Sequence, residues 1–342
     1  MQPQRTIRTL LTLLPALAAA QPPIFHSDTR VVEVAIIAQD PHHIPIQDLR
    51  KEDLRLFDNG IEQTILSYDK IGNTPTLGKP TRLTIIVLDG LNSSWADQIY
   101  GRAAVAKMLE TFPEGVDRIA IVALDKELHV VHDFSHDAAS LRAAVLSYDR
   151  ERSLDIESTL GLQPPASAAV GRQPQLPVSK LIEHRSELTG DAFKAIADTL
   201  GAVQGEKNLI WVVSAIAGSH GLLDLEAPVR KLAAAKVTVY PVDPRGLTLK
   251  PVKDDAAIEV ARQTGGRAFS QSNDVAKQVR TAIDDSREGY ILTYAPTNYR
   301  EDGTLHQVTL KIKRSAVDLR YRPWYFADPP NPIHNNFPPL FP

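Results

Sequence analysis

The hydrophobic pattern changes twice along the chain, and each change predicts a different kind of structure. Between residues 25 and 70, short β-branched and alternating runs are interrupted by prolines and by the turn Asp58-Asn59-Gly60. Asn-Gly between apolar residues favours a β-hairpin, because both central residues of its tight turn need positive φ. We therefore predict a strand-rich unit over residues 25–70. A linker with two glycines and two prolines follows over residues 71–81.

Residues 82–287 alternate between continuous apolar runs and amphipathic stretches. Leu83–Leu88 is uninterrupted and apolar, which is typical of a strand buried on both faces. Helical stripes separate it from similar runs at Asn208–Ser214 and Val237–Val242. This alternation predicts an α/β fold, with a Rossmann-like, mostly parallel sheet flanked by helices. Residues 150–188 contain four prolines and are predicted to be an irregular insertion.

The end of the chain returns to a β pattern over residues 288–326. Val308, Leu310 and Ile312 alternate with polar residues, as in a sheet with one face exposed to water. So few strands cannot bury enough apolar surface alone, and we expect them to pack on the N-terminal strands as one accessory β unit. Residues 327–342 are rich in proline and are predicted to be a flexible tail.

The first twenty residues have the features of a signal peptide. Arg5 and Arg8 precede a short apolar run, and Ala18-Ala19-Ala20 provides the small residues of a cleavage site. We therefore expect residues 1–20 to be removed and the protein to be exported, to a periplasm or to the cell exterior. No later stretch is long and apolar enough for membrane insertion after cleavage.

Charge and composition exclude several classes of function. With 38 basic and 41 acidic residues, the net charge of -3 creates no overall attraction for nucleic acid. The absence of cysteine excludes disulfides, thiolate metal sites and a cysteine nucleophile. His129 and His132 are three apart on a predicted strand, so we expect them to point to opposite faces as solvated side chains.

Several motifs occur along the chain in a fixed order. They are Leu49…Glu52-Asp53-Leu54…Phe57-Asp58-Asn59-Gly60…Gln63, Leu88-Asp89-Gly90-Leu91-Asn92-Ser93, Gly205-Glu206-Lys207-Asn208-Leu209-Ile210-Trp211, Thr264-Gly265-Gly266 and Gly289-Tyr290-Ile291-Leu292. Their order resembles a von Willebrand factor type A (VWA) domain, and more closely the VWFA-related family of exported bacterial proteins, over about the whole mature chain. The resemblance implies a Rossmann-like VWA fold and a protein-binding role, with no defined enzymatic activity.

The same resemblance implies the position of a metal-ion-dependent adhesion site. In VWA domains an Asp-x-Ser-x-Ser loop, a threonine and a second aspartate hold a divalent cation, whose coordination an acidic group of the partner completes. Asp89 and Ser93 match the first and last loop positions, and Thr189 stands where the threonine is expected, just before a predicted helix. Leu91 replaces the middle serine, and Ala215 stands where the second aspartate is expected.

We therefore expect a degenerate adhesion site composed of Asp89, Asn92, Ser93 and Thr189. One carboxylate where two are usual provides too little charge for a high-affinity cation, so no cofactor is expected. A weak Mg²⁺ site would use Asp89, Ser93 and Thr189, with an extra oxygen from Asn92 or Asp224. Alternatively, Asp89 accepts backbone N–H bonds and caps the loop and helix that follow. The expected partner is a protein, bound at the carboxyl end of the sheet.

One enzymatic alternative stays open. Ser219, in Ala217-Gly218-Ser219-His220-Gly221, approximates the nucleophile motif of serine hydrolases, and Asp243 or Asp254 and then His306 would complete a triad in the order Ser, Asp, His. That motif needs its serine on the sharp turn directly after a strand, whereas Ser219 lies further along a loop. His306 is on a predicted strand of the other unit. We therefore expect a binding protein and no enzyme.

Overall fold

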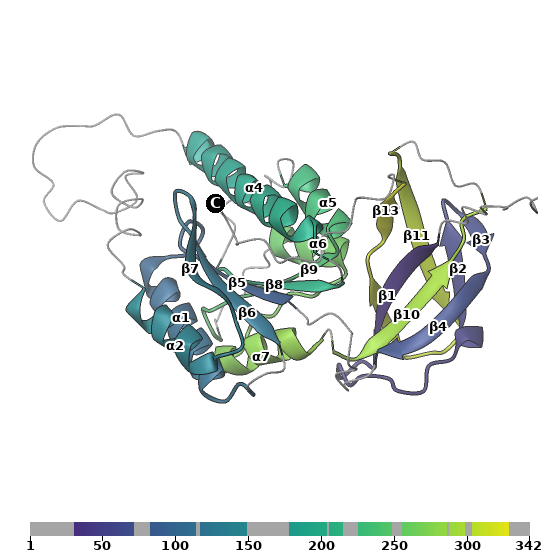
Figure 1. The fold of residues 1–342 in the computed structure, drawn as a ribbon, viewed down its shortest axis with the longest axis horizontal. Coiled ribbons are helices and arrows are strands. Elements are labelled where there is room, and N and C mark those ends of the chain that lie inside the picture. The colour runs from purple at the N-terminus through teal and green to yellow at the C-terminus, as the bar shows by residue number, and fades with distance from the viewer. Residues whose placement is uncertain are drawn as a thin grey trace, which may run out of the picture.

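The computed structural model contains an α/β unit and a β unit that lie side by side (Figure 1). The predicted signal peptide, nearly all of the linker and of the proline-rich tail, and most of the irregular insertion lie outside the residues that it describes, as do Ala215, Ser219, Asp224 and Asp254. The structure describes residues 31–71, 83–113, 117–148, 178–203, 205–214, 225–247, 255–285, 287–297 and 303–327.

The α/β unit is built on a sheet that has five strands within the described residues, in the order β7-β6-β5-β8-β9. Neighbouring strands of β5, β6, β8 and β9 are parallel, while β7 is an antiparallel edge strand paired with β6. Every residue of β5 and β8 is buried, as their continuous apolar runs predict. The strands are β5 (Leu83–Asp89), β6 (Arg118–Leu124), β7 (Leu128–Ser135), β8 (Lys207–Val212) and β9 (Val237–Val242).

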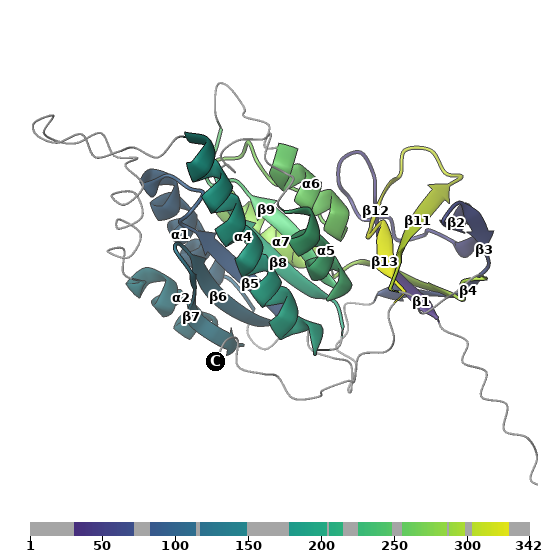
Figure 2. The ribbon, with the colours of Figure 1, turned by 90° about the horizontal axis from the view of Figure 1, so that it is seen from above.

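Helices cover both faces of this sheet and enclose two apolar cores (Figure 2). On one face lie α1 (Trp95–Glu110), α2 (Ala138–Ser147) and α7 (Val275–Asp285). On the other lie α4 (Val178–Gly201), α5 (Glu226–Ala234) and α6 (Asp255–Thr264). The mixed α/β fold with a mostly parallel sheet is thus confirmed. Among the described residues, no helix combines the length and the apolar character needed to cross a bilayer.

Helix α4 corrects two expectations. It begins at Val178, so residues 178–188 are helical and do not belong to an irregular insertion, and Thr189 lies inside the helix instead of just before it. The prolines that suggested irregular structure end at Pro177, and the following stretch is rich in good helix formers. Leu188 also packs against the core, which extends the apolar stripe towards the N-terminus of the helix.

In the β unit, strands from the two ends of the chain pair with one another. Strand β1 is antiparallel to β10, and β2 is antiparallel to β11. The hairpin between β2 and β3 turns at Asn59 and Gly60, with φ of 48° and 81°. The strands are β1 (Val32–Gln39), β2 (Leu54–Asp58), β3 (Ile61–Gln63), β4 (Ile65–Ile71), β10 (Gly289–Tyr294), β11 (Leu305–Ile312), β12 (Asp318–Tyr321) and β13 (Trp324–Phe326), with a 3₁₀ turn at Lys51–Asp53.

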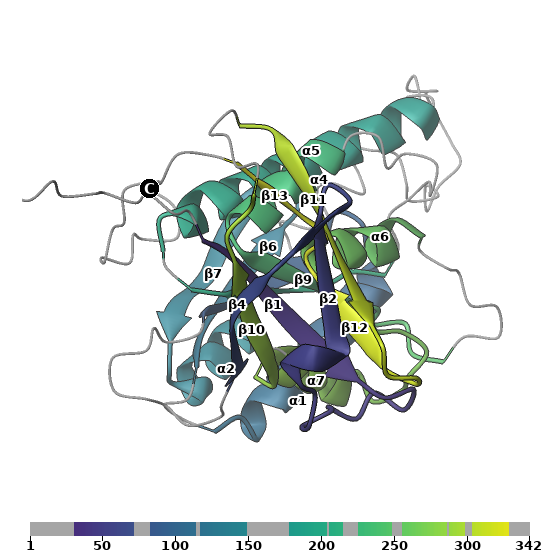
Figure 3. The ribbon, with the colours of Figure 1, turned by 90° about the vertical axis from the view of Figure 1, so that its right-hand side faces the viewer.

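These strands form two sheets that pack face to face around Ile36, Leu56 and Tyr294, each fully buried (Figure 3). Within the described residues the sheet orders are β12-β1-β10-β4 and β13-β11-β2-β3. The edge strands β3 and β4 follow one another directly in sequence, as do β12 and β13. The chain therefore passes from one sheet to the other at both sides, which leaves little unpaired strand edge.

A buried carboxylate joins the two units. Asp285, at the end of α7, accepts hydrogen bonds from Arg320 Nη2 at 2.9 and 2.8 Å and from Gln39 Nε2 at 3.1 Å. Arg267 Nη2 of the α/β unit lies 3.3 Å from the same carboxylate. A second ion pair, between Arg322 and Glu206 at 3.0 Å, also crosses the boundary. The units are therefore held together by charged groups withdrawn from water.

Lys207 makes the stability of the α/β unit depend on pH. Its ammonium is buried and donates to the carbonyl of Leu200, in the last turn of α4, at 3.1 Å and to that of Val203, just beyond the helix, at 2.6 Å. Burial lowers the pKa of Lys207 from 10.5 to about 8. Above pH 8 the folded protein therefore releases this proton while the unfolded chain still holds it, so stability rises with pH in this window.

We expect the Lys207 contribution to the free energy of unfolding to increase by about 1 kcal/mol between pH 7.5 and pH 9. Urea denaturation at the two pH values measures it, and the Lys207→Met variant is the control because it removes the titrating group. The difference between wild type and variant should change with pH in the stated direction. Parallel pH profiles for the two proteins would contradict the assignment.

Candidate functional site

The candidate site begins where β5 ends. Asp89 is the last residue of β5, and the loop from Gly90 to Ser93 leads to Ser94, the N-cap of α1. Ser94 Oγ accepts from the N–H of Asp97 at 3.3 Å. The N–H groups of Gly90 and Leu91 both donate to the carbonyl of Leu124, at 2.8 and 3.1 Å. The loop is thus fixed between the carboxyl ends of β5 and β6.

The Asp89 carboxylate is only 3% exposed and accepts three N–H groups. Oδ1 accepts from the Asn92 backbone N at 2.7 Å, and Oδ2 accepts from Asn92 Nδ2 at 2.9 Å and from Trp211 Nε1 at 2.8 Å. Burial raises the pKa of Asp89, while these hydrogen bonds oppose the rise because they stabilise the charged form. One alternative predicted that Asp89 caps the loop and the helix that follow it. Asp89 does accept a backbone N–H of its own loop, from Asn92. The cap of helix α1, however, is Ser94.

The Asn92 amide connects Asp89, at the end of β5, to helix α4, which covers one face of the sheet. Its Nδ2 also donates to Thr189 Oγ1 in α4 at 3.0 Å, and Thr189 is fully buried. Ser93 Oγ accepts from the backbone N of Ser214, just beyond β8, at 3.1 Å. The structure therefore brings the four predicted site residues together. We refer to Asp89, Asn92, Thr189 and Trp211 as the Asp89 cluster.

Trp211 is a site residue that the sequence indicates only as part of the apolar run Asn208–Ser214. Its ring is fully buried and packs edge-to-face on Phe193, with centroids 5.0 Å apart. Because β8 lies beside β5 and pairs Trp211 with Val87, the indole N–H is close to the end of β5. The available signal was the indole itself, since a buried tryptophan N–H usually requires an acceptor.

The donor set of the cluster does not fit a divalent cation. Mg²⁺ and Ca²⁺ bind oxygen atoms, yet both Asp89 oxygens face N–H donors, and Asn92 presents its nitrogen to the other members. Leu91 points into the apolar core and is 1% exposed. In the part of the chain that the structure describes, no three acidic or histidine side chains are grouped as metal ligands.

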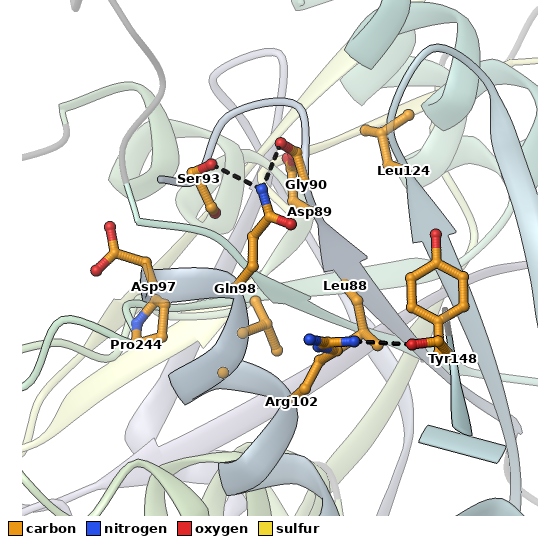
Figure 4. A pocket seen from close by; sticks show the side chains of 12 residues that line it. Leu88, Asp89, Gly90, Ser93, Asp97, Gln98, Arg102, Leu124, Tyr148 and Pro244 are labelled. Carbon is orange, nitrogen blue, oxygen red and sulfur yellow. Dashed lines mark hydrogen bonds between the residues drawn. The ribbon is translucent and has the colours of Figure 1, made fainter. Parts of the chain in front are cut away.

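A pocket of about 390 Å³, including space open to solvent, lies beside the cluster (Figure 4). Gln98 and Arg102 of α1 line it together with Leu124, Tyr148 and Pro244. Gln98 Nε2 donates to the carbonyls of Gly90 and Ser93, both at 3.0 Å, and Arg102 Nη1 donates to the carbonyl of Tyr148 at 2.9 Å. These amide and guanidinium groups therefore hold the loop and the end of α2 in place.

The structure separates the described members of the predicted hydrolase triad. Asp243, after β9, forms a salt bridge with Arg245 at 2.7 Å. His306 lies in the β unit, where its Nδ1 is 2.8 Å from Asp58 Oδ1 and 3.1 Å from the hydroxyl of Tyr325. Asp243 and His306 therefore have other partners in different units, while Ser219 and Asp254 lie outside the described residues.

His129 and His132 were predicted to be solvated; both are partly exposed, but each also has a protein side chain as partner. His129 Nε2 lies 2.9 Å from Asp125 Oδ1, and His132 Nε2 lies 2.8 Å from Ser140 Oγ, and both contacts are partly buried. The pairing of β6 with β7 shifts register between Ile119 and Val122. Such irregularities change which side chains point inward, so simple alternation along the strand does not hold here.

Comparison with known proteins gives similarity in structure only. No family model matches the sequence, and no curated protein matches it. The solved structures to which the chain is similar include a von Willebrand factor type A protein from Catenulispora acidiphila, with 12% identity, a TM-score of 0.39, and coverage of 86% of this chain and 73% of that one.

Two further similar structures come from Bacteroides. The aerotolerance-related membrane protein of Bacteroides fragilis is 10% identical, and BatB of Bacteroides thetaiotaomicron is 14% identical. Each has a TM-score of 0.36, and each alignment covers 60% of this chain and 98% of the other. At these identities the likeness concerns the fold alone. The chemistry of the site follows from the contacts described above.

Proposed function

We propose that this chain is an exported VWA-type protein that binds a protein partner through the carboxyl end of its five-stranded sheet, with a degenerate adhesion site and no enzymatic activity. The observation that carries the proposal is the Asp89 cluster. It links β5, α4 and β8 at the edge of the sheet where ligands of doubly wound folds bind. The Asp89 carboxylate accepts its hydrogen bonds from Asn92 and Trp211 within the cluster. We infer that its role is to fix the shape of this edge of the sheet.

Exposed apolar side chains near the same edge favour a protein partner. Tyr100 of α1 is 51% exposed, and Leu247, beyond the carboxyl end of β9, is 64% exposed. The segments that carry them meet where Gly101 faces Val212 and Pro244. A Cβ at position 101 would lie 2.8 Å from Val212 Cγ1 and 3.4 Å from Pro244 Cβ, so a larger residue does not fit there without a shift of Val212. Aromatic side chains such as Tyr100 are enriched at the centres of protein interfaces.

Export and cation-independent binding can be tested in one experiment. A photo-crosslinking amino acid at position 247, introduced in the full chain and expressed in a bacterial host, should give a discrete crosslinked protein in the periplasmic or extracellular fraction. The product should persist in EDTA, because the proposed interface contains no cation. Tyr100→Ala should weaken capture of that partner by about tenfold or more, the loss typical of a central interface residue.

The matched control places the same crosslinker at Ile61 in the β unit, which is also exposed, at 47%. Position 61 should give no such product. Equal crosslinking from positions 61 and 247, or a product that disappears in EDTA, would contradict the proposed surface. Retention of the whole chain in the cytoplasm would contradict export.

A further inference from the structure

A side-chain amide lies between the Asp89 carboxylate and the Thr189 hydroxyl. Asn92 Nδ2 is 2.9 Å from Asp89 Oδ2 and 3.0 Å from Thr189 Oγ1. Its two N–H groups can therefore serve one acceptor each. All three side chains are at least nine-tenths buried, so water contributes little to their hydrogen bonding.

The charge of the buried carboxylate is balanced by partial positive charges. A carboxylate removed from water needs hydrogen-bond donors or a counter-ion. Asp89 receives two N–H groups from Asn92 and one from Trp211, and none of its hydrogen-bond partners among the described residues is a cationic side chain. The donors of Asn92 thus provide much of the compensation that a cation would otherwise supply.

The other end of the amide shows that this orientation is imposed by the cluster. Asn92 Oδ1 is buried and has no hydrogen-bond partner in the part of the chain that the structure describes. Turning the amide over would place this oxygen against Asp89 Oδ2, where two acceptors would repel each other. An unsatisfied buried oxygen is unfavourable, so the nitrogen is held at Asp89 and Thr189 at the expense of the oxygen.

We propose that Asn92 is an internal substitute for a divalent cation: its amide nitrogen joins the Asp89 carboxylate to the Thr189 hydroxyl and holds the loop in a cation-independent form. This inference rests on the proposed function, because it concerns the same adhesion site. Recognition at the site then needs no acidic group from the partner to complete a coordination shell. The substitute is a property of this chain's own residues and can be tested without a partner.

The test converts the amide into a carboxylate. Asn92→Asp keeps the size of the side chain but places an oxygen about 3 Å from Asp89 Oδ2, and like charges at that distance require a shared proton or a cation. At pH 7.5 in EDTA, the variant should have a clearly lower Tm than wild type. Addition of 5 mM MgCl₂ or MnCl₂ should restore at least half of the difference, while the Tm of wild type should be unchanged by either salt.

Asn208→Asp is the matched control. Asn208 is also buried, at the start of β8. This variant should lose stability without recovery in either salt. The inference is overturned if wild type itself gains Tm with cations, if Asn92→Asp equals wild type in EDTA, or if cations restore Asn92→Asp no better than Asn208→Asp.

If Asn92→Asp does not fold in any buffer, wild type and Asn92→Ser decide the question by NMR. A side-chain amide pair that exchanges slowly with water, is insensitive to 5 mM MgCl₂ and is missing from Asn92→Ser supports the inference. Rapid exchange, or a shift of that pair with MgCl₂, overturns it. The two proposals can fail separately. A negative result for the Asn92 variants would contradict the role of Asn92 but not the protein interface probed at position 247. A negative crosslinking result would contradict that interface but not the role of Asn92.

Discussion

Replacing Asp285 with alanine is expected to lower the free energy of unfolding by about 3–5 kcal/mol, because it leaves buried guanidinium groups without their counter-ion. The Asp285 side chain is 1% exposed, and its partners Arg320 and Arg267 are 12% and 16% exposed. The carboxylate also accepts from Gln39. Denaturation in urea at pH 7 measures the loss.

The adjacent Asp284 provides the control for this prediction. It pairs with Arg280 at 2.7 Å and with Arg287, but its side chain is 38% exposed. Water therefore replaces much of the interaction when Asp284 is removed, and Asp284→Ala should cost about 1 kcal/mol or less. If Asp285→Ala were no more destabilising than Asp284→Ala, the carboxylate would not be the group that joins the two units.

Replacing Trp211 with alanine is expected to destabilise the protein by about 3–5 kcal/mol, since it opens a large cavity beside Phe193. Trp211→Phe separates packing from hydrogen bonding, because it keeps an aromatic ring but removes the N–H that reaches Asp89 Oδ2 at 2.8 Å. We expect the phenylalanine variant to lose about 1–3 kcal/mol at neutral pH.

The pH dependence of this loss identifies its cause. Without the indole donor, the charged form of Asp89 is less stable, so the pKa of Asp89 in the folded state rises further. The deficit of Trp211→Phe should therefore be larger at pH 8 than at pH 5, as measured by urea denaturation. Trp324→Phe, in the core of the β unit, is the control and should show a deficit that does not change with pH. A pH-independent deficit for Trp211→Phe would show that packing alone is responsible.

The candidate site was predictable in part. Asp89, Asn92 and Ser93 lie within five residues of one another, so the loop motif after an apolar strand identifies them together. Thr189 was identified from its place in the order of motifs along the chain. The role of Trp211 was not, because a tryptophan in a buried strand satisfies the apolar pattern equally well with its N–H directed elsewhere. The position of Thr189 within α4 was also missed, since proline content indicates where helices are interrupted but not how soon they resume.

The sequence by itself determined the mixed α/β class, because continuous apolar runs such as β5 must be buried on both faces and amphipathic stretches must cover them. It also determined local features such as the Asn59-Gly60 turn, whose backbone conformation depends on those two residues. Only the tertiary structure decided which distant groups meet: Asn92 with Thr189, Asp89 with Trp211, and Asp285 with Arg320. Hydrogen bonds between such partners depend on strand order and helix position, and these are set by the packing of the whole fold and not by the residues on either side of each partner.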